Sequence, residues 1–199
     1  MPKKKSARNS AENFIKSLAE IADFSEEIYE ADLSKLHESW CYEYAVIRLY
    51  RDFERLMLNC VVAAINNDTS LLSDKKGFNF PKHLTDEVCE YIVVGDGYFD
   101  FRGRSGLISL LKRYLPDDHY LVAIVKDSRY RDTLDQLTAF RNFAAHASKP
   151  SKDALLKATG LTKVGSAGSC LKANDGRRFG KLVEDLKKLA EKIKRDAPY

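Results

Sequence analysis

The sequence has no long apolar run. Its most apolar stretch, CVVAAI at residues 60–65, is far shorter than the roughly 20 residues that a membrane-spanning helix needs. The basic opening MPKKKSARNS leads into no apolar segment, so it does not resemble a secretory signal. We therefore expect a cytoplasmic protein without membrane spans.

Cysteine is scarce, and its residues lie far apart. No Cys-x-x-Cys pair occurs, which argues against a zinc site because zinc ligands come in close pairs. Most of these thiols lie in apolar surroundings, where reduced cysteine packs as a small hydrophobe. We expect reduced thiols, no metal and no other cofactor. The cysteines are Cys41, Cys60, Cys89 and Cys170.

A phosphate-binding loop is also missing. The glycine-rich stretch GDGYFDFRGRSG, residues 95–106, lacks the Gly-Lys-Ser/Thr ending of a P-loop and the flanking strand of a dinucleotide fold. We expect a connecting loop here, in which Arg102 and Arg104 are available for contacts with an RNA backbone.

Charge is divided unevenly along the chain. The net charge is +4, but residues 11–100 carry a net charge of −10 and residues 101–199 carry +10. A basic half attracts polyanions such as RNA. Alternatively, the two halves neutralise each other by packing together, or an acidic face meets a basic face in a dimer. The first ten residues predict a flexible basic tail, with an address signal or a nucleic-acid arm as alternatives.

What the chain does contain is helical periodicity. Hydrophobic residues make up 44% of its 199 residues, enough for a single domain over residues 11–199. Apolar residues recur at helical spacing through most of the chain. Residues 118–127 are ambiguous between a strand and a helix, but no partner strand is evident, so we predict a short helix there. The pattern predicts an all-α helical bundle. We expect helices from residue 10, at about 36–66, 84–94, 105–115, 128–148 and 176–195, with a loop at 159–176.

Two details of this interpretation concern caps and buried faces. In the helix at 36–66 we expect Trp40 and Tyr44 to belong to the buried stripe. In the helix at 84–94 we expect Thr85 to be the N-cap and Val88 to lie in the core.

The segment AFRNFAAHASKP, residues 139–150, places three polar side chains in an apolar helix. Arg141 and His146 are five residues apart, so their side chains diverge by roughly 140° on a regular helix. Either the helix is irregular, or Arg141 curls round, or the two side chains line a cleft that another chain completes.

Arginine and histidine together suit the cleavage of RNA. A guanidinium binds phosphate through paired hydrogen bonds, and an imidazole exchanges protons near neutral pH. Deprotonating the 2′-hydroxyl beside a stabilised phosphate cleaves the strand without a metal. Asn142 would hold the imidazole tautomer or bind a phosphate oxygen. The alternative is structural: the three side chains brace the helix by bonding to backbone carbonyls.

The stretch FRNFAAHAS resembles the signature of the HEPN superfamily, an arginine, a polar residue and then a histidine. Here these positions are Arg141, Asn142 and His146. The helix YRDFERLMLNCV, the leucine-rich LDQLTAF before the motif and the final CLKANDGRRFGKLVEDLKKLAEKI are similar to the RiboL-PSP-HEPN branch, so the resemblance covers about residues 36–195. The loop at 159–176 departs from that branch, because it reads VGSAGSC and lacks the Pro-Gly expected there.

This resemblance implies a HEPN-like helical bundle and a metal-independent endoribonuclease. Such domains act in toxin–antitoxin or antiviral defence, sometimes restrained by an antitoxin protein, and dimerise so that two motifs face one shared cleft. Arg141 and His146 carry over as catalytic, Asn142 as supporting them, and Glu54 as the acid of the early helix. Lys149 and Lys152, like Arg102 and Arg104, are expected to contact RNA. The alternative is a non-catalytic HEPN adaptor that binds a nucleotide, a nucleic acid or a protein.

Overall fold

Every regular element of the structure is a helix. The computed structural model describes residues 4–199 and forms no strand within them, so the predicted all-α fold is confirmed. Among these residues no helix combines the length and hydropathy that crossing a bilayer requires. In chain order the helices are α1 (Ala7–Glu30), α2 (Lys35–Asn67), α3 (Ser70–Lys76), α4 (Asp86–Val94), α5 (Gly103–Lys112), α6 (Tyr120–Lys126), the 3₁₀ turn η1 (Ser128–Tyr130), α7 (Arg131–His146), α8 (Lys149–Thr159), α9 (Ala167–Leu171) and α10 (Arg177–Asp196).

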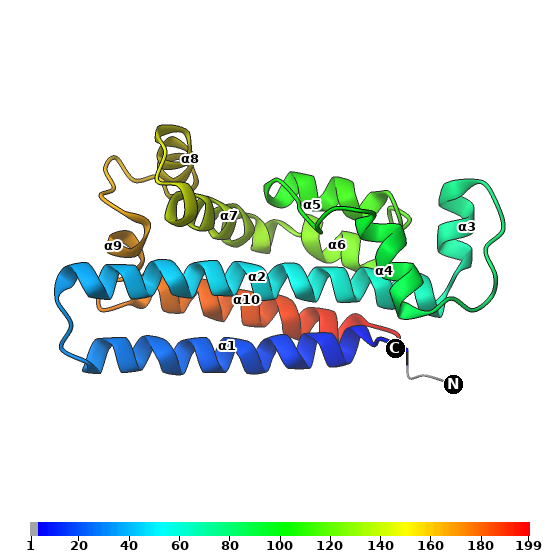
Figure 1. The fold of residues 1–199 in the computed structure, drawn as a ribbon, viewed down its shortest axis with the longest axis horizontal. Helices are drawn as coiled ribbons and strands as arrows, with labels where there is room; N and C mark the ends of the chain where they lie inside the picture. The colour runs from blue at the N-terminus through cyan, green and yellow to red at the C-terminus, as the bar shows by residue number, and fades with distance from the viewer. Residues whose placement is uncertain (1–3) are drawn as a thin grey trace.

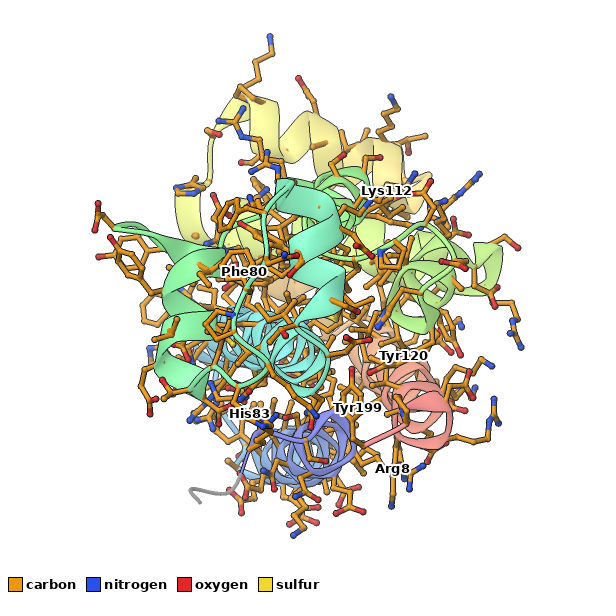
Figure 2. The ribbon with its side chains drawn as sticks, turned by 90° about the vertical axis from the view of Figure 1, so that its right-hand side faces the viewer. Arg8, Phe80, His83, Lys112, Tyr120 and Tyr199 are labelled. Carbon is orange, nitrogen blue, oxygen red and sulfur yellow. The ribbon has the colours of Figure 1, made fainter. Side chains whose placement is uncertain are left out.

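The three longest helices, α1, α2 and α10, run side by side along the length of the molecule, and the shorter helices from α5 to α8 lie along one side of them (Figure 1). The start of α1 and the end of α10 meet at one end, where Arg8 Nε donates a hydrogen bond to the carbonyl of Ala197 at 2.8 Å. Arg8 and Tyr199 are both labelled at this end in Figure 2. The other end carries α8, α9 and the beginning of α2 (Figure 1).

The first helix begins earlier than the sequence predicted. Ser6 caps α1 by accepting a hydrogen bond from the backbone N–H of Asn9, and Ala7 and Ala11 are fully buried. The prediction of a flexible tail over residues 1–10 is therefore wrong for residues 7–10, which are helical; residues 1–3 lie outside the described part of the chain. Two alanines carry the buried face there, too small an apolar signal to stand out among lysines.

The long predicted helix is confirmed as α2, but part of its predicted buried face is wrong. Trp40 is 55% exposed and Tyr44 is 59% exposed, whereas Tyr42 and Leu49 are buried. The first half of α2 carries apolar residues on more than one face, and periodicity does not say which face meets a neighbour. Packing of neighbouring helices decides: the Tyr42 ring, for example, lies 5.5 Å from the ring of Phe179 on α10.

In helix α4, too, the helix itself was predicted correctly but one of its buried residues was not. Thr85 is its N-cap, as predicted, and accepts a hydrogen bond from the N–H of Val88. Val88 itself is 45% exposed, so the prediction that it lies in the core is wrong. Cys89, one position on, is buried instead.

The remaining elements agree with the sequence in part. The ambiguous segment at 118–127 forms the short helix α6, as predicted. Of the connecting loop expected at 95–106, residues 95–102 are without helix, but residues 103–106 already belong to α5, so that part of the prediction is wrong. The last predicted helix is α10. Helix α8 was not predicted, and the expected loop at 159–176 contains the five-residue helix α9. Both begin with a serine capping box, a short-range signal that apolar periodicity does not reveal.

Candidate functional site

Helix α7 presents the motif, and it is regular to its last residue. Leu137 and Phe140 anchor one face in the core, while Arg141 is half-buried and His146 is exposed at the C-terminus. The helix ends at Ala147, a left-handed residue with φ of 46° whose N–H bonds to the carbonyl of Phe143 at 3.0 Å. An irregular helix therefore does not explain the five-residue spacing.

Arg141 is held by a ring and an amide. Its guanidinium carbon lies 5.0 Å from the centroid of the Tyr50 ring on α2, within the range of a cation–π contact. Its Nη1 donates a hydrogen bond of 2.9 Å to Oδ1 of Asn142. Within residues 4–199, Asn142 forms no hydrogen bond with His146, so its observed contact orients the guanidinium rather than the imidazole.

Glu54, the acid that the resemblance picks out on the early helix, lies close enough to Arg141 for their charges to interact. Burial raises the pKa of its carboxyl to about 7, the positive charge of Arg141 opposes that rise, and the negative charge of Asp100 adds to it. Burial likewise raises the pKa of Tyr50 to about 12, with a further contribution from the charge of Glu54. The half-buried acid thus changes protonation near neutral pH, next to the one cation that favours its ionised form.

Sequence reasoning missed Tyr50 and Asp100. Tyr50 lies four residues before Glu54, hence on the same face of α2, and this spacing is the signal that was available. Its hydroxyl donates to the carbonyl of Phe101 at 3.3 Å, and the two rings lie 5.7 Å apart. The glycine-rich connection therefore packs against the site and brings Asp100 near Glu54, a placement that no local sequence pattern indicates.

The bracing alternative finds no hydrogen bond to support it. Among the described residues, no side chain of the motif bonds to a backbone carbonyl, and His146 forms no side-chain hydrogen bond at all. Other arginines of this protein do brace helix ends: Arg8 bonds to Ala197 O, Arg104 to Val125 O and Lys126 O, and Arg178 to Cys170 O. Arg141 differs from all three, because its charge is positioned but its remaining donors are not used.

The four basic residues expected to contact RNA fall into two groups. Lys149 and Lys152 line a cavity of about 380 Å³ that begins at the end of the motif helix. Arg102 is exposed just before α5. Arg104 bonds through Nε and Nη2 to the end of α6, so two of its donors already serve the fold.

In residues 4–199, no three His, Cys, Asp or Glu side chains gather closely enough to hold a metal ion. No family model, no curated protein and no solved structure matches the chain. The resemblance to the HEPN superfamily thus depends on the motif and its setting.

Proposed function

We propose that this protein is a metal-independent endoribonuclease of the HEPN type. It would cleave RNA by attack of the 2′-hydroxyl on the neighbouring phosphate, giving 2′,3′-cyclic phosphate and 5′-hydroxyl ends. A toxin–antitoxin or antiviral defence role is part of the proposal, which comes from the motif resemblance.

One observation carries the proposal: the motif side chains are positioned, but within residues 4–199 none of them bonds to a backbone carbonyl. Arg141 is fixed by Tyr50 and Asn142, yet it bonds to no carbonyl of the fold. His146 is exposed and forms no side-chain hydrogen bond within residues 4–199. A positioned cation and an uncommitted imidazole on one helix are the two groups that phosphate binding and proton transfer require.

The residues take separate roles in the proposed reaction. His146 accepts the proton of the 2′-hydroxyl, whose oxygen forms a bond to phosphorus while the bond to the 5′-oxygen breaks. The 5′-oxygen leaves with a proton from the imidazolium or from water. Arg141 binds a non-bridging oxygen and stabilises the charge of the transition state. Tyr50 and Asn142 keep the guanidinium in place, and Glu54 lies close enough for its charge to act on it.

We also propose a homodimer, because Arg141 and His146 diverge on the regular helix α7 and a second copy would complete the site. An exposed apolar stripe on α2 supports a protein contact nearby: Leu36 is 58%, Trp40 55% and Tyr44 59% exposed. Exposed aromatic side chains are typical of interface centres. The stripe leads toward Glu54 along α2. Sedimentation velocity at micromolar concentration tests this part of the proposal. A wild-type protein that sediments as a monomer, at the same rate as Trp40→Lys, would contradict it.

The test is cleavage of a 5′-labelled mixed-sequence RNA by the purified protein in EDTA. Wild type should cut the RNA and leave cyclic-phosphate ends, while Arg141→Ala and His146→Ala should lose at least about 100-fold in rate, as loss of a catalytic acid–base or electrostatic group does. Arg131→Ala, an exposed arginine at the start of α7, is the matched arginine control. His83→Ala, in the connection between α3 and α4, is the histidine control (Figure 2).

The controls decide how the outcome is interpreted. Cleavage that persists in both motif variants belongs to a contaminant and contradicts the proposal. Absence of cleavage by a folded wild-type protein, on RNA pools that include structured and tRNA-like substrates, favours the adaptor alternative over the enzyme.

A further inference from the structure

A cavity of about 380 Å³ opens where α7 passes into α8. One wall comes from Phe143 and Ala144 of α7, and another from Glu43 of α2. Lys149 and Lys152 of α8 stand beside it, and the segment that begins at Gly165 completes it. Its lining residues come from α2, α7, α8 and the segment that leads into α9, and α8, α9 and the start of α2 lie at the same end of the molecule (Figure 1).

The glycine- and serine-rich segment builds the far wall, which gives the unexplained sequence VGSAGSC a role. A Cβ atom on Gly168 would lie 1.8 Å from the carbonyl oxygen of Ser39, so only glycine lets α9 approach α2 this closely. Ser39 and Ser166 share a hydrogen bond of 2.8 Å across the contact. The backbone N–H of Gly168 donates to Oε1 of Glu43 at 3.2 Å, which fixes that carboxylate at the edge of the cavity.

The lining has an apolar part and a charged part. Phe143, Ala144 and Ala147 form the apolar part. Neither Lys149 nor Lys152 forms an ion pair with an acid in residues 4–199, so both ammonium groups remain available for phosphate. The second carboxylate oxygen of Glu43 accepts no hydrogen bond within residues 4–199. A carboxylate only accepts hydrogen bonds, so this oxygen favours a ligand that presents a donor group.

The cavity adjoins the candidate catalytic group. Ala144 lies three residues after Arg141, one turn along the same helix. Glu43 lies seven residues before Tyr50, two turns or about 10 Å along the same face of α2. His146 lies in the chain between Ala144 and Ala147, which both line the cavity.

We infer that this cavity is a nucleobase subsite for single-stranded RNA, which holds the base next to the cleaved phosphate and selects bases with an exocyclic amino group. The inference deepens the proposed ribonuclease function and depends on it. Glu43 would accept hydrogen bonds from the amino group of guanine, adenine or cytosine. Uracil presents one imino donor between two carbonyl oxygens, which a carboxylate repels. Lys149 and Lys152 would pair with the flanking phosphates.

Binding of RNA that cannot be cleaved tests the subsite separately from catalysis. The probes are four fluorescein-labelled 2′-O-methyl RNA decamers: one contains only uridine, and each of the others has a single guanosine, adenosine or cytidine in place of one uridine. Binding is measured by fluorescence anisotropy. Wild type should bind the substituted decamers at least about fivefold more tightly than oligouridine, the size expected for one added hydrogen-bonded base contact. Glu43→Gln keeps an acceptor for the Gly168 N–H and should lose this preference.

A pair of neighbouring alanines provides the matched control. Ala144→Leu fills the cavity and should weaken binding of the guanosine-containing decamer about tenfold or more. Ala145→Leu adds the same side chain at the adjacent exposed position, which does not line the cavity, and should bind like wild type.

The outcomes separate the subsite from the enzyme. Equal binding of the four decamers by wild type, or equal binding by the two alanine variants, overturns the subsite and leaves the cleavage result in EDTA untouched. Selective binding that Ala144→Leu abolishes supports the subsite, and the cleavage assay alone then decides whether the RNA is a substrate.

Discussion

The guanidinium carbon of Arg141 lies 5.0 Å from the centre of the Tyr50 ring, so a half-buried cation on α7 rests on an aromatic ring of α2. Each partner also donates a hydrogen bond: Arg141 to Oδ1 of Asn142, and the Tyr50 hydroxyl to the carbonyl of Phe101. The contact therefore joins the motif helix, the long helix α2 and the glycine-rich connection. It gives the motif a position that the motif sequence itself does not specify.

Removal of this ring should reduce the proposed cleavage through Arg141. Tyr50→Leu should lower kcat about tenfold, because a partly desolvated cation–π contact contributes about 1–2 kcal/mol. Tyr50→Phe keeps the ring and loses only the 3.3 Å bond to Phe101 O, so its kcat should stay within about threefold of wild type. Single-turnover cleavage of labelled RNA measures both. Equal losses in the two variants would show that the ring does not position Arg141.

The free energy of unfolding should distinguish a side chain that supports the fold, such as Arg104, from the motif residue His146. Arg104→Gln removes bonds to two carbonyls at the end of α6 and should cost about 1–2 kcal/mol of unfolding free energy. His146→Ala removes an exposed side chain without a hydrogen bond and should change that free energy by less than about 0.5 kcal/mol. Urea unfolding followed by circular dichroism gives both values. A loss above about 1 kcal/mol for His146→Ala would favour the structural bracing role.

Protonation of Glu54 should make stability depend on pH. Its pKa is raised from 4.5 in the unfolded chain to about 7 in the fold, chiefly by burial. The folded state therefore binds the proton more tightly, and the stability this gives is lost as pH rises from about 4.5 through 7. Glu54→Gln carries no such charge, so it should be more stable than wild type by about 1–2 kcal/mol at pH 8, after allowance for solvent screening.

The same variant should differ little from wild type at pH 4.5, where Glu54 is largely protonated in the fold. Unfolding curves in urea at pH 4.5, 6 and 8 would reveal the trend. A difference between the two proteins that stays constant over this range would mean that Arg141 keeps Glu54 ionised throughout.

Two glycines should respond oppositely to the same substitution. Gly168→Ala would place its Cβ 1.8 Å from the Ser39 carbonyl oxygen, so α9 must move away from α2, at a cost of about 3 kcal/mol or more by overpacking. Gly180→Ala lies within α10, where a Cβ meets nothing within 4 Å, and should stabilise the fold by about 0.5–1 kcal/mol. Thermal unfolding compares them. Similar melting temperatures for the two variants would contradict the close packing of α9.

The sequence by itself determined the all-α class, the helices α2 and α10, and the start of α4. Apolar spacing in α10 and across α2 is long and regular, so the 3.6-residue period alone predicts these helices. Thr85 before α4 is a cap whose hydrogen bond depends only on residues nearby in the chain. The motif residues Arg141 and His146 were likewise found by local order along one helix.

Only the tertiary structure decided which faces meet and what surrounds the motif. Trp40 and Tyr44 have the spacing of core residues, but the helices that pack on α2 cover Tyr42 and Leu49 instead. Tyr50 contacts Arg141 from 91 residues away in the chain, and the charge of Asp100 acts on Glu54 from 46 residues away. Contacts over such separations follow from the packing of whole helices, because each side chain's partner depends on the position of every other element.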